Sequence, residues 1–375
     1  MIQNILILGH HHKTVVACRH LSAQGHCVYV IQRRYLVDTK DGFEDDTSFD
    51  ITKFNGDWLP ELMLWSSECE NDVVDRRKLW PLHLKEIAIS DLLVYIEPSL
   101  ASIELDQIIS FTEHNYWLDF EHKLSDLHNL NNNMSDDTRK FCSTKSIQDS
   151  IWKRLGIPTI PNDSNKVIVK FDGIGGGDQF LVVNKSKEHI LDPDKIREDG
   201  KYLTLANEWS NFVIQDYVDI DYQISCHFYC NDNTWYHLNT HVMYYEDNCP
   251  VESNTSYVIQ DDDNKIITDS IKKLSKELSI PNRLVGWQFV KTKDGKLYST
   301  DFNARPFGGY DAGSYDTDVS DQNWVDYLMG ETPPEAIKYT HEITCKYIDK
   351  QQFGYSGFER FKNKLDLKYE VTKYD

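Results

Sequence analysis

The sequence predicts an α/β protein whose C-terminal part is α+β: an N-terminal open parallel α/β domain followed by a two-lobed module. Three observations support this. The chain begins strand, glycine, helix, strand over residues 2–31; a glycine loop at residues 172–178 lies between two strands; and a hairpin spans residues 286–305. The first pattern is typical of a βαβ unit with parallel strands. The other two indicate antiparallel pairing, which short loops allow.

Length and composition exclude several classes of protein. A chain of 375 residues is long enough for two or three domains with a large core. No apolar run reaches the roughly 18–20 residues of a membrane helix, and the N-terminus lacks the basic region of a signal peptide. A net charge of −20 argues against nucleic-acid or anionic-membrane binding. The eight scattered cysteines form no CxxC pair, so we expect a cytoplasmic protein with reduced thiols.

The N-terminal domain is expected over residues 1–127. Its predicted elements are strands at residues 2–8, 27–31 and 91–96 and a helix at residues 14–23. After Gly9 come His10, His11 and His12 instead of the GxGxxG fingerprint, so a dinucleotide-dependent dehydrogenase is disfavoured. The histidines follow the carboxyl end of a parallel strand, where ligands bind in open sheets. They either face a substrate or belong to a solvated loop.

A linker and a lead-in helix are expected over residues 128–165. Residues 128–137 are polar and have the composition of a linker or surface loop. Residues 146–155 predict a helix, which Gly156 and Pro158 end.

The small lobe is expected over residues 166–216, with a glycine loop between two strands. The loop contains Gly175, Gly176 and Gly177 and lacks the Gly-Lys-Ser/Thr of a Walker A motif. Between strands it suits a flap whose backbone N–H groups fold over phosphates, and Lys170 at the strand end would add a positive charge. The alternative is an ordinary hairpin loop with a surface lysine.

A polar pair at the end of the next strand has the pattern of a nucleotide hinge. Gln215 and Asp216 are followed by Tyr217 and Val218. The backbone here can offer one C=O and one N–H to an adenine edge, beside an apolar slot for the ring. The alternative is an ordinary strand end.

The C-terminal lobe is expected over residues 217–335, followed by a strand-like extension over residues 336–375. Its hairpin has Asp294-Gly295 as a predicted two-residue turn. Counting outward from that turn places Gln288 opposite Asp301 on one face. Asn303 lies two residues further along the same strand and points to the same face, and Arg305 follows. Such oxygen ligands suit Mg²⁺, which shares its remaining positions with phosphates and water.

Taken in order, these motifs resemble the ATP-grasp superfamily over roughly residues 135–335. The family pattern is a basic residue before a helix, Gly-Ile-Pro, Val-Val-Lys, a glycine flap, a Glu-Glu-Tyr-Ile hinge and a terminal Glu-x-Asn-x-Arg strand. This chain has Lys145 before its helix, Gly156-Ile-Pro158, Val169-Lys170 and Asp301-Phe-Asn303-Ala-Arg305. The N-terminal α/β domain matches the lobe that commonly precedes an ATP-grasp module.

The resemblance implies a set of site residues. Lys145 and Lys170 would bind ATP phosphates beneath the flap glycines Gly175, Gly176 and Gly177. The remaining roles are adenine binding by Gln215, Asp216 and Val218, ribose binding by Asp221, Mg²⁺ (or Mn²⁺) binding by Gln288, Asp301 and Asn303, and contact with the transferred phosphoryl group or acyl substrate by Arg305. The chain departs from the family where Asp301 and Asp221 replace glutamates and Gln215-Asp216 replaces an acidic pair.

The resemblance implies an ATP- and Mg²⁺-dependent carboxylate–amine ligase that forms a C–N bond through an acyl phosphate and releases ADP and phosphate. Arg305 and Lys170 would be its catalytic residues, and small carboxylates and amines its substrates. The alternative is a nucleotide-binding protein of the same fold without ligase turnover, acting as a sensor or partner subunit. Bicarbonate activation is disfavoured by size and by the absence of a Met-Lys-Met segment. Dimers are common in the family, so a homodimer stays open.

Several other residues allow two interpretations. Cys226, Cys230, His237 and His241 have loose zinc-ligand spacing, but cysteines at strand spacing are more often buried small hydrophobes. His237, His241, Tyr244 and Tyr245 either bind the acceptor substrate or pack within strands. Beyond Arg305, Asp311 lies in a glycine-rich loop and would be able to meet a cationic amine.

Overall fold

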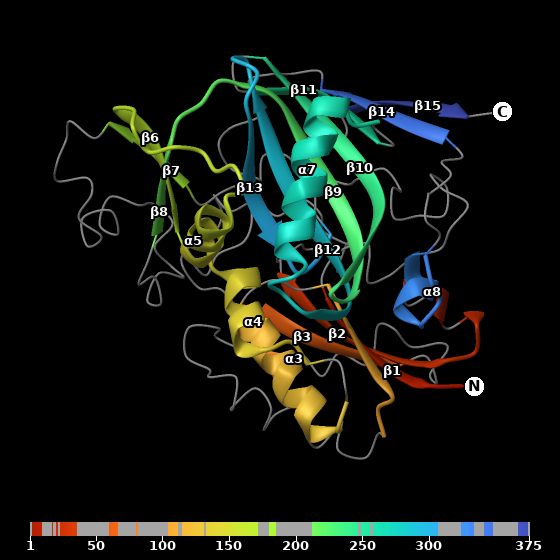
Figure 1. Ribbon diagram of the computed structural model, residues 1–375. Helices are drawn as coiled ribbons and strands as arrows, with labels where there is room; N and C mark the ends of the chain where they lie inside the picture. Colours follow the sequence, from red (N-terminus) through yellow and green to blue (C-terminus); the bar gives the residue numbers. More distant parts are fainter. Residues whose placement is uncertain are drawn as a thin grey trace.

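The computed structural model describes residues 2–9, 17, 20–21, 23–35, 60–66, 80–81, 104–111, 115–130, 133–171, 180–184, 212–246, 249–255, 258–306, 324–333, 341–347 and 367–373. Within them the chain forms three sheets with helices packed against them (Figure 1). The fold is mixed α/β with both parallel and antiparallel sheets, as predicted.

The N-terminal sheet has the strand order β4-β3-β2-β1-β5. Its strands are β1 (Asn4–Gly9), β2 (Cys27–Tyr35), β3 (Pro60–Ser66), β4 (Trp80–Pro81) and β5 (Gln107–Ser110). The strand β1 runs parallel to β2 and β5, which confirms the parallel start. However, β3 pairs antiparallel with both β2 and β4, so the sheet is mixed. The expectation of a wholly parallel sheet was wrong. The strand predicted at residues 91–96 lies outside the described residues.

A seven-stranded antiparallel sheet forms the centre of the molecule, in the order β13-β12-β9-β10-β11-β14-β15. Its strands are β9 (Ile220–Asp232), β10 (Thr234–Glu246), β11 (Cys249–Thr255), β12 (Ile280–Thr292), β13 (Leu297–Asn303), β14 (His341–Tyr347) and β15 (Leu367–Lys373). The last two confirm that the C-terminal extension is strand-like. The sheet is long and twisted, and α7 (Asp261–Leu274) lies along one of its faces (Figure 1).

Alternate residues of the central strands give that face its apolar character. Ile224, Cys226 and Phe228 of β9 and Trp287 and Phe289 of β12 are fully buried or nearly so, and they pack with α7 and with α5 (Lys145–Leu155). Because side chains alternate along a strand, the intervening residues lie on the opposite face. Those residues are largely polar, and they form the site described below.

A three-stranded antiparallel sheet, β7-β6-β8, lies beside the β13 edge (Figure 1). Its strands are β6 (Lys166–Phe171), β7 (Phe180–Asn184) and β8 (Phe212–Asp216). Pairing of β6 with β7 confirms the predicted strand, loop, strand order. The glycine loop itself, with Gly175, Gly176 and Gly177, lies outside the described residues.

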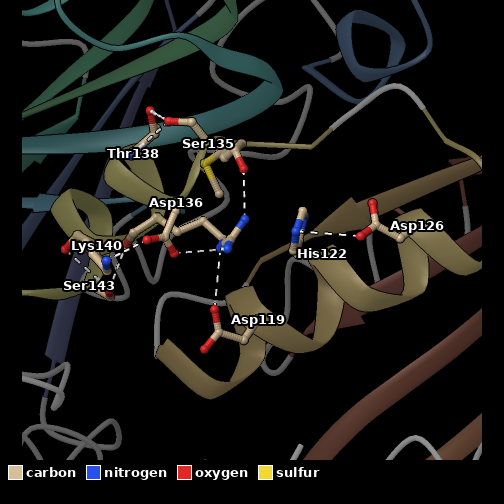
Figure 2. Close-up of polar contacts among 10 residues, drawn as sticks. Asp119, His122, Asp126, Ser135, Asp136, Thr138, Lys140 and Ser143 are labelled. Carbon is tan, nitrogen blue, oxygen red and sulfur yellow. Dashed lines mark hydrogen bonds and ion pairs between the residues drawn. The ribbon is translucent and has the colours of Figure 1, made fainter. Parts of the chain in front are cut away.

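Three helices connect the N-terminal sheet to this module: α3 (Asn115–Leu127), α4 (Asp136–Ser143) and α5. The linker predicted at residues 128–137 is too long at its end, because α4 already begins at Asp136. Ser135 caps α4 by accepting from the Thr138 N–H at 3.1 Å. Figure 2 shows Asp119 of α3 and Asp136 of α4 facing the same guanidinium, which is that of Arg139, at 3.4 and 3.2 Å.

The helix α5 ends where the sequence predicted. Gly156 adopts a left-handed conformation with φ of 62°, and its N–H and that of Ile157 bond to Lys153 and Trp152 carbonyls. The chain then runs beside the β13 edge, where the Ser299 N–H donates to the Pro158 carbonyl at 2.8 Å. This segment covers an edge that would otherwise expose unpaired backbone groups.

Two further helices lie in the C-terminal part of the chain. The helix α7 begins at Asp261, and three aspartates in its first turn favour the helix N-terminus. The short helix α8 spans Trp324–Leu328. No helix among the described residues is long and apolar enough to cross a membrane.

Candidate active site at the edge of the central sheet

The β12–β13 hairpin brings Gln288 opposite Asp301, as predicted. The predicted two-residue turn is wrong, because Thr292 pairs with Lys296 around a three-residue loop, with its N–H donating to the Lys296 carbonyl at 2.9 Å. Gly295, with φ of 85°, closes the loop in a conformation that favours glycine. This loop shifts the register by one residue, and an irregularity between the Gln288 and Phe289 pairs restores it.

One face of this hairpin carries the predicted metal ligands; we call it the site face. Asp301 and Asn303 lie on it together, with the Asn303 amide nitrogen 3.4 Å from the second Asp301 oxygen. Gln288 donates through its amide nitrogen to the Ser225 hydroxyl at 3.3 Å, so this contact does not use its amide oxygen. Arg305 follows two residues beyond the end of β13 and is buried, with its guanidinium donating to the Pro306 carbonyl at 2.7 Å.

The helix α5 supplies the site with a row of polar side chains at helical spacing. The Lys145 ammonium contacts the Asp301 carboxylate. One turn further, Gln148 is fully buried, and its amide nitrogen donates to the Phe302 and Phe141 carbonyls at 2.7 and 2.9 Å. Its amide oxygen accepts from the Phe302 N–H at 3.4 Å. A side-chain amide thus fixes the strand edge between the two proposed metal ligands.

Lys170 reaches the same place from the small lobe. Its ammonium donates to the Thr300 carbonyl at 3.2 Å, so both predicted phosphate lysines meet neighbouring residues of β13. Burial lowers the pKa of Lys170 to about 8 by disfavouring the charged form, while the nearby Asp149 carboxylate acts in the opposite direction. This lysine can bind an anion while it is protonated.

The residues of the predicted adenine hinge differ in their hydrogen bonding. Gln215 is buried, and its amide oxygen has no hydrogen-bond partner among the described residues. In contrast, the Asp216 carboxylate accepts from the Ser164 N–H at 2.7 Å, and the Asp216 N–H donates to the Pro161 carbonyl at 2.7 Å. Asp216 therefore holds the neighbouring loop. Val218 is half-buried beyond β8, and Asp221 is exposed.

The donor set fits a hard cation. Gln288, Asp301 and Asn303 present one carboxylate and two amides from adjacent strands, and oxygen ligands of this kind suit Mg²⁺. The Lys145 ammonium at Asp301 shows that a positive charge fits there. No group of three or more His, Cys, Asp and Glu residues with metal-site geometry occurs in the described part of the chain, which leaves the zinc interpretation without support.

Polar residues continue the site face across the sheet. Asp301, Gln288, Ser225 and His241 are paired in succession across β13, β12, β9 and β10. Beside them, a ring nitrogen of His227 lies 2.9 Å from the Asn239 amide oxygen, and both residues are buried. This row extends the polar surface well beyond the metal ligands.

The four residues predicted as candidates for acceptor binding lie on two opposite faces of the central sheet, two on each face. His241 lies on the site face, and burial lowers its pKa to about 4. The Tyr245 hydroxyl donates to the Gln223 amide oxygen at 3.4 Å on that side. His237 packs on Phe228 and Tyr244 on Tyr222, both on the apolar face. Cys226 and Cys230 are also buried in that apolar core.

Some predicted residues cannot be compared with the structure. His10, His11 and His12 and Asp311, like the flap glycines, lie outside the described residues. Gln148 and Asp149 were not predicted at all. The signal for them was present in the sequence, because they stand three and four residues after Lys145 and so share its face of a helix.

Comparisons with known proteins agree with this architecture. No protein-family model and no curated protein matches the sequence. Among solved structures, an L-amino acid ligase from Bacillus licheniformis aligns with a TM-score of 0.61 at 13% identity, covering 92% of this chain and 80% of that one. A biotin carboxylase–beta-gamma-ATP complex from Campylobacter jejuni aligns with 0.60 at 13%, covering 92% and 76%.

A third similar structure is N5-carboxyaminoimidazole synthetase from Staphylococcus aureus complexed with ADP, with a TM-score of 0.59 at 14% identity and coverage of 92% and 82%. At these identities the likeness is one of fold. It confirms the ATP-grasp fold that the order of the sequence motifs predicted.

Proposed function

We propose that this chain is an ATP- and Mg²⁺-dependent carboxylate–amine ligase. The observation that carries the proposal is the convergence of Lys145 and Lys170 on the strand that bears Asp301 and Asn303, two residues before Arg305. In a protein of this fold, that arrangement places cationic side chains and cation ligands at one point. The structures that it resembles include a ligase and complexes with ATP-type and ADP nucleotides.

The chemistry proposed for these residues is phosphoryl transfer to a carboxylate. Lys145 and Lys170 would hold the phosphates, and Arg305 would meet the transferred group or the acyl oxygen. Their charges offset the negative charge at the phosphoryl oxygens, and positioning supplies much of the rest. Gln288, Asp301 and Asn303 would hold Mg²⁺, which when bound neutralises phosphate charge. The resulting acyl phosphate would then be attacked by an amine, which forms the C–N bond and releases phosphate.

A nucleotide-binding role without turnover is the second candidate. It is favoured by the ligand set, since Asp301 is the single carboxylate among the three proposed metal ligands and replaces the longer glutamate. A shorter carboxylate and two neutral amides bind a divalent cation more weakly than two carboxylates do.

The deciding experiment offers ATP, Mg²⁺ and a panel of amino acids and small carboxylates, singly and in pairs. We expect ADP and phosphate to appear only with a matched pair, together with a product lighter than the two substrates by one water. Asp301→Ala should abolish this turnover. Measurable ATP binding, with no ADP formed with any pair, would instead support the nucleotide-binding role.

A further inference from the structure

The proposed metal centre carries an unusual balance of charge. Asp301 is its carboxylate, whereas Gln288 and Asn303 are neutral. The Lys145 ammonium contacts Asp301, and Lys170 bonds to the preceding residue. Asp149 also acts on Lys170, but it is paired with Lys153 at 2.6 Å. The carboxylate of the proposed centre is therefore already paired with an ammonium before any phosphate binds, which is unfavourable for a free divalent cation.

Lys145 blocks the one anionic ligand directly. The side chains of Lys145 and Asp301 are 15% and 24% exposed, so solvent screens their attraction only in part. A free Mg²⁺ ion would have to displace the ammonium from Asp301 and then lie beside it. A metal–nucleotide complex differs, because its phosphates carry an excess of negative charge and can accept the displaced ammonium.

The backbone that carries Lys145 is fixed to β13 by a neighbouring side chain. Gln148, on the same face of α5, bonds to the backbone of Phe302. The helix is thereby fixed to the residue that follows Asp301. The exchange of Lys145 from carboxylate to phosphate consequently needs a change of side-chain rotamer and no movement of the helix.

From these contacts we infer that the centre takes a divalent cation together with a nucleoside di- or triphosphate and rejects the free cation, and that Lys145 is the residue that imposes this selectivity. The inference rests on the proposed function for the identity of the nucleotide site. Nucleotide and metal must then favour each other's binding by the same factor, since the coupling of two ligands is reciprocal.

The test measures Mn²⁺ binding to the full chain, first without nucleotide and then with ADP. The electron paramagnetic resonance signal of the free ion reports how much Mn²⁺ stays unbound. We expect Mn²⁺ alone to bind weakly to the wild type, and ADP to strengthen its binding by roughly tenfold or more. Lys145→Met, which keeps length and removes charge, should let Mn²⁺ bind about tenfold more tightly without nucleotide and should reduce the effect of ADP.

Three further variants serve as controls for the Mn²⁺ binding measurement. Lys140→Met removes a lysine from an exposed pair with Asp136 and should leave Mn²⁺ binding unchanged. Adding Asp301→Asn to Lys145→Met should abolish the gained affinity. Lys145→Gln serves as a second neutral variant, and thermal unfolding confirms that each variant is folded.

Equal Mn²⁺ affinity of wild type and both folded Lys145 variants without nucleotide would overturn the inference. So would a gained affinity that survives Asp301→Asn. The readout involves no turnover, so failure to form ADP with any substrate pair would count against the ligase alone. Tight Mn²⁺ binding by the wild type without nucleotide would count against the selectivity alone.

Discussion

At the scale of single residues, the phosphate-binding role proposed for Lys170 predicts that nucleotide affinity depends on pH. Burial lowers its pKa to about 8 in the free protein, whereas a bound phosphate favours the ammonium and raises that pKa. Affinity for MgADP should therefore be constant below pH 8. It should fall by up to about tenfold per pH unit as pH rises between the free and the bound pKa. Calorimetric titration with MgADP from pH 7.5 to 9.5 measures this.

The control for that titration is Lys170→Arg. A guanidinium stays protonated over the whole range, so the variant should bind MgADP with a flat profile. A wild-type profile that stays flat to pH 9.5 would show that Lys170 makes no contact with the phosphates.

At the scale of elements, the edge of β13 depends on one side chain of α5. Gln148→Leu would leave the Phe302 N–H and C=O and the Phe141 C=O without their present partner. Since each buried group left unpaired costs about 1–3 kcal/mol, we expect a loss of about 2–4 kcal/mol in the free energy of unfolding, measured in urea.

Arg154→Met is the matched control on the same helix. Arg154 forms a 2.6 Å pair with Glu277 at the surface, with side chains 56% and 36% exposed. Its loss should change stability by less than about 1 kcal/mol. If Gln148→Leu were as mild as this control, the amide would not be what holds the strand edge.

The pairing of β13 with β12 was predicted correctly at one point for a wrong reason. Gln288 does lie opposite Asp301, but the two-residue turn from which this was predicted is absent from the structure. A three-residue loop ending at Gly295 and an irregularity near Thr300 shift the register in opposite directions, so their effects cancel. Neither was visible in the sequence, because Asp-Gly also suits the longer loop and the run Ser-Thr-Asp has no apolar alternation to reveal a slip.

At the scale of the whole molecule, the order of the motifs was enough to predict the ATP-grasp fold, because each motif marks a separate element. The contacts between elements were harder to predict from the sequence. The helix α4 starts in a polar run with linker composition; Ser135 caps it, and Arg139 pairs with Asp119 of α3 as well as with Asp136 of α4 itself. Such contacts between helices carry no local pattern. The antiparallel β3 and β4 also depend on pairing between distant residues.

A buried ion pair joins α3 to β12, and it gives the last prediction. Glu121 of α3 pairs with Arg283 of β12, both almost fully buried, and Arg283 also donates to the Ala304 carbonyl at 3.2 Å. Arg283→Met should lower the free energy of unfolding by about 3–5 kcal/mol, because it leaves the Glu121 charge buried and unpaired.

Replacing both partners should be less harmful than replacing one. In Glu121→Leu with Arg283→Met no buried charge remains, so the double variant should regain most of the stability that Arg283→Met loses. Denaturant unfolding of the wild type, both single variants and the double variant measures the coupling. Losses that simply add would mean that the two side chains act independently. Strong coupling would show that the ion pair itself joins α3 to β12.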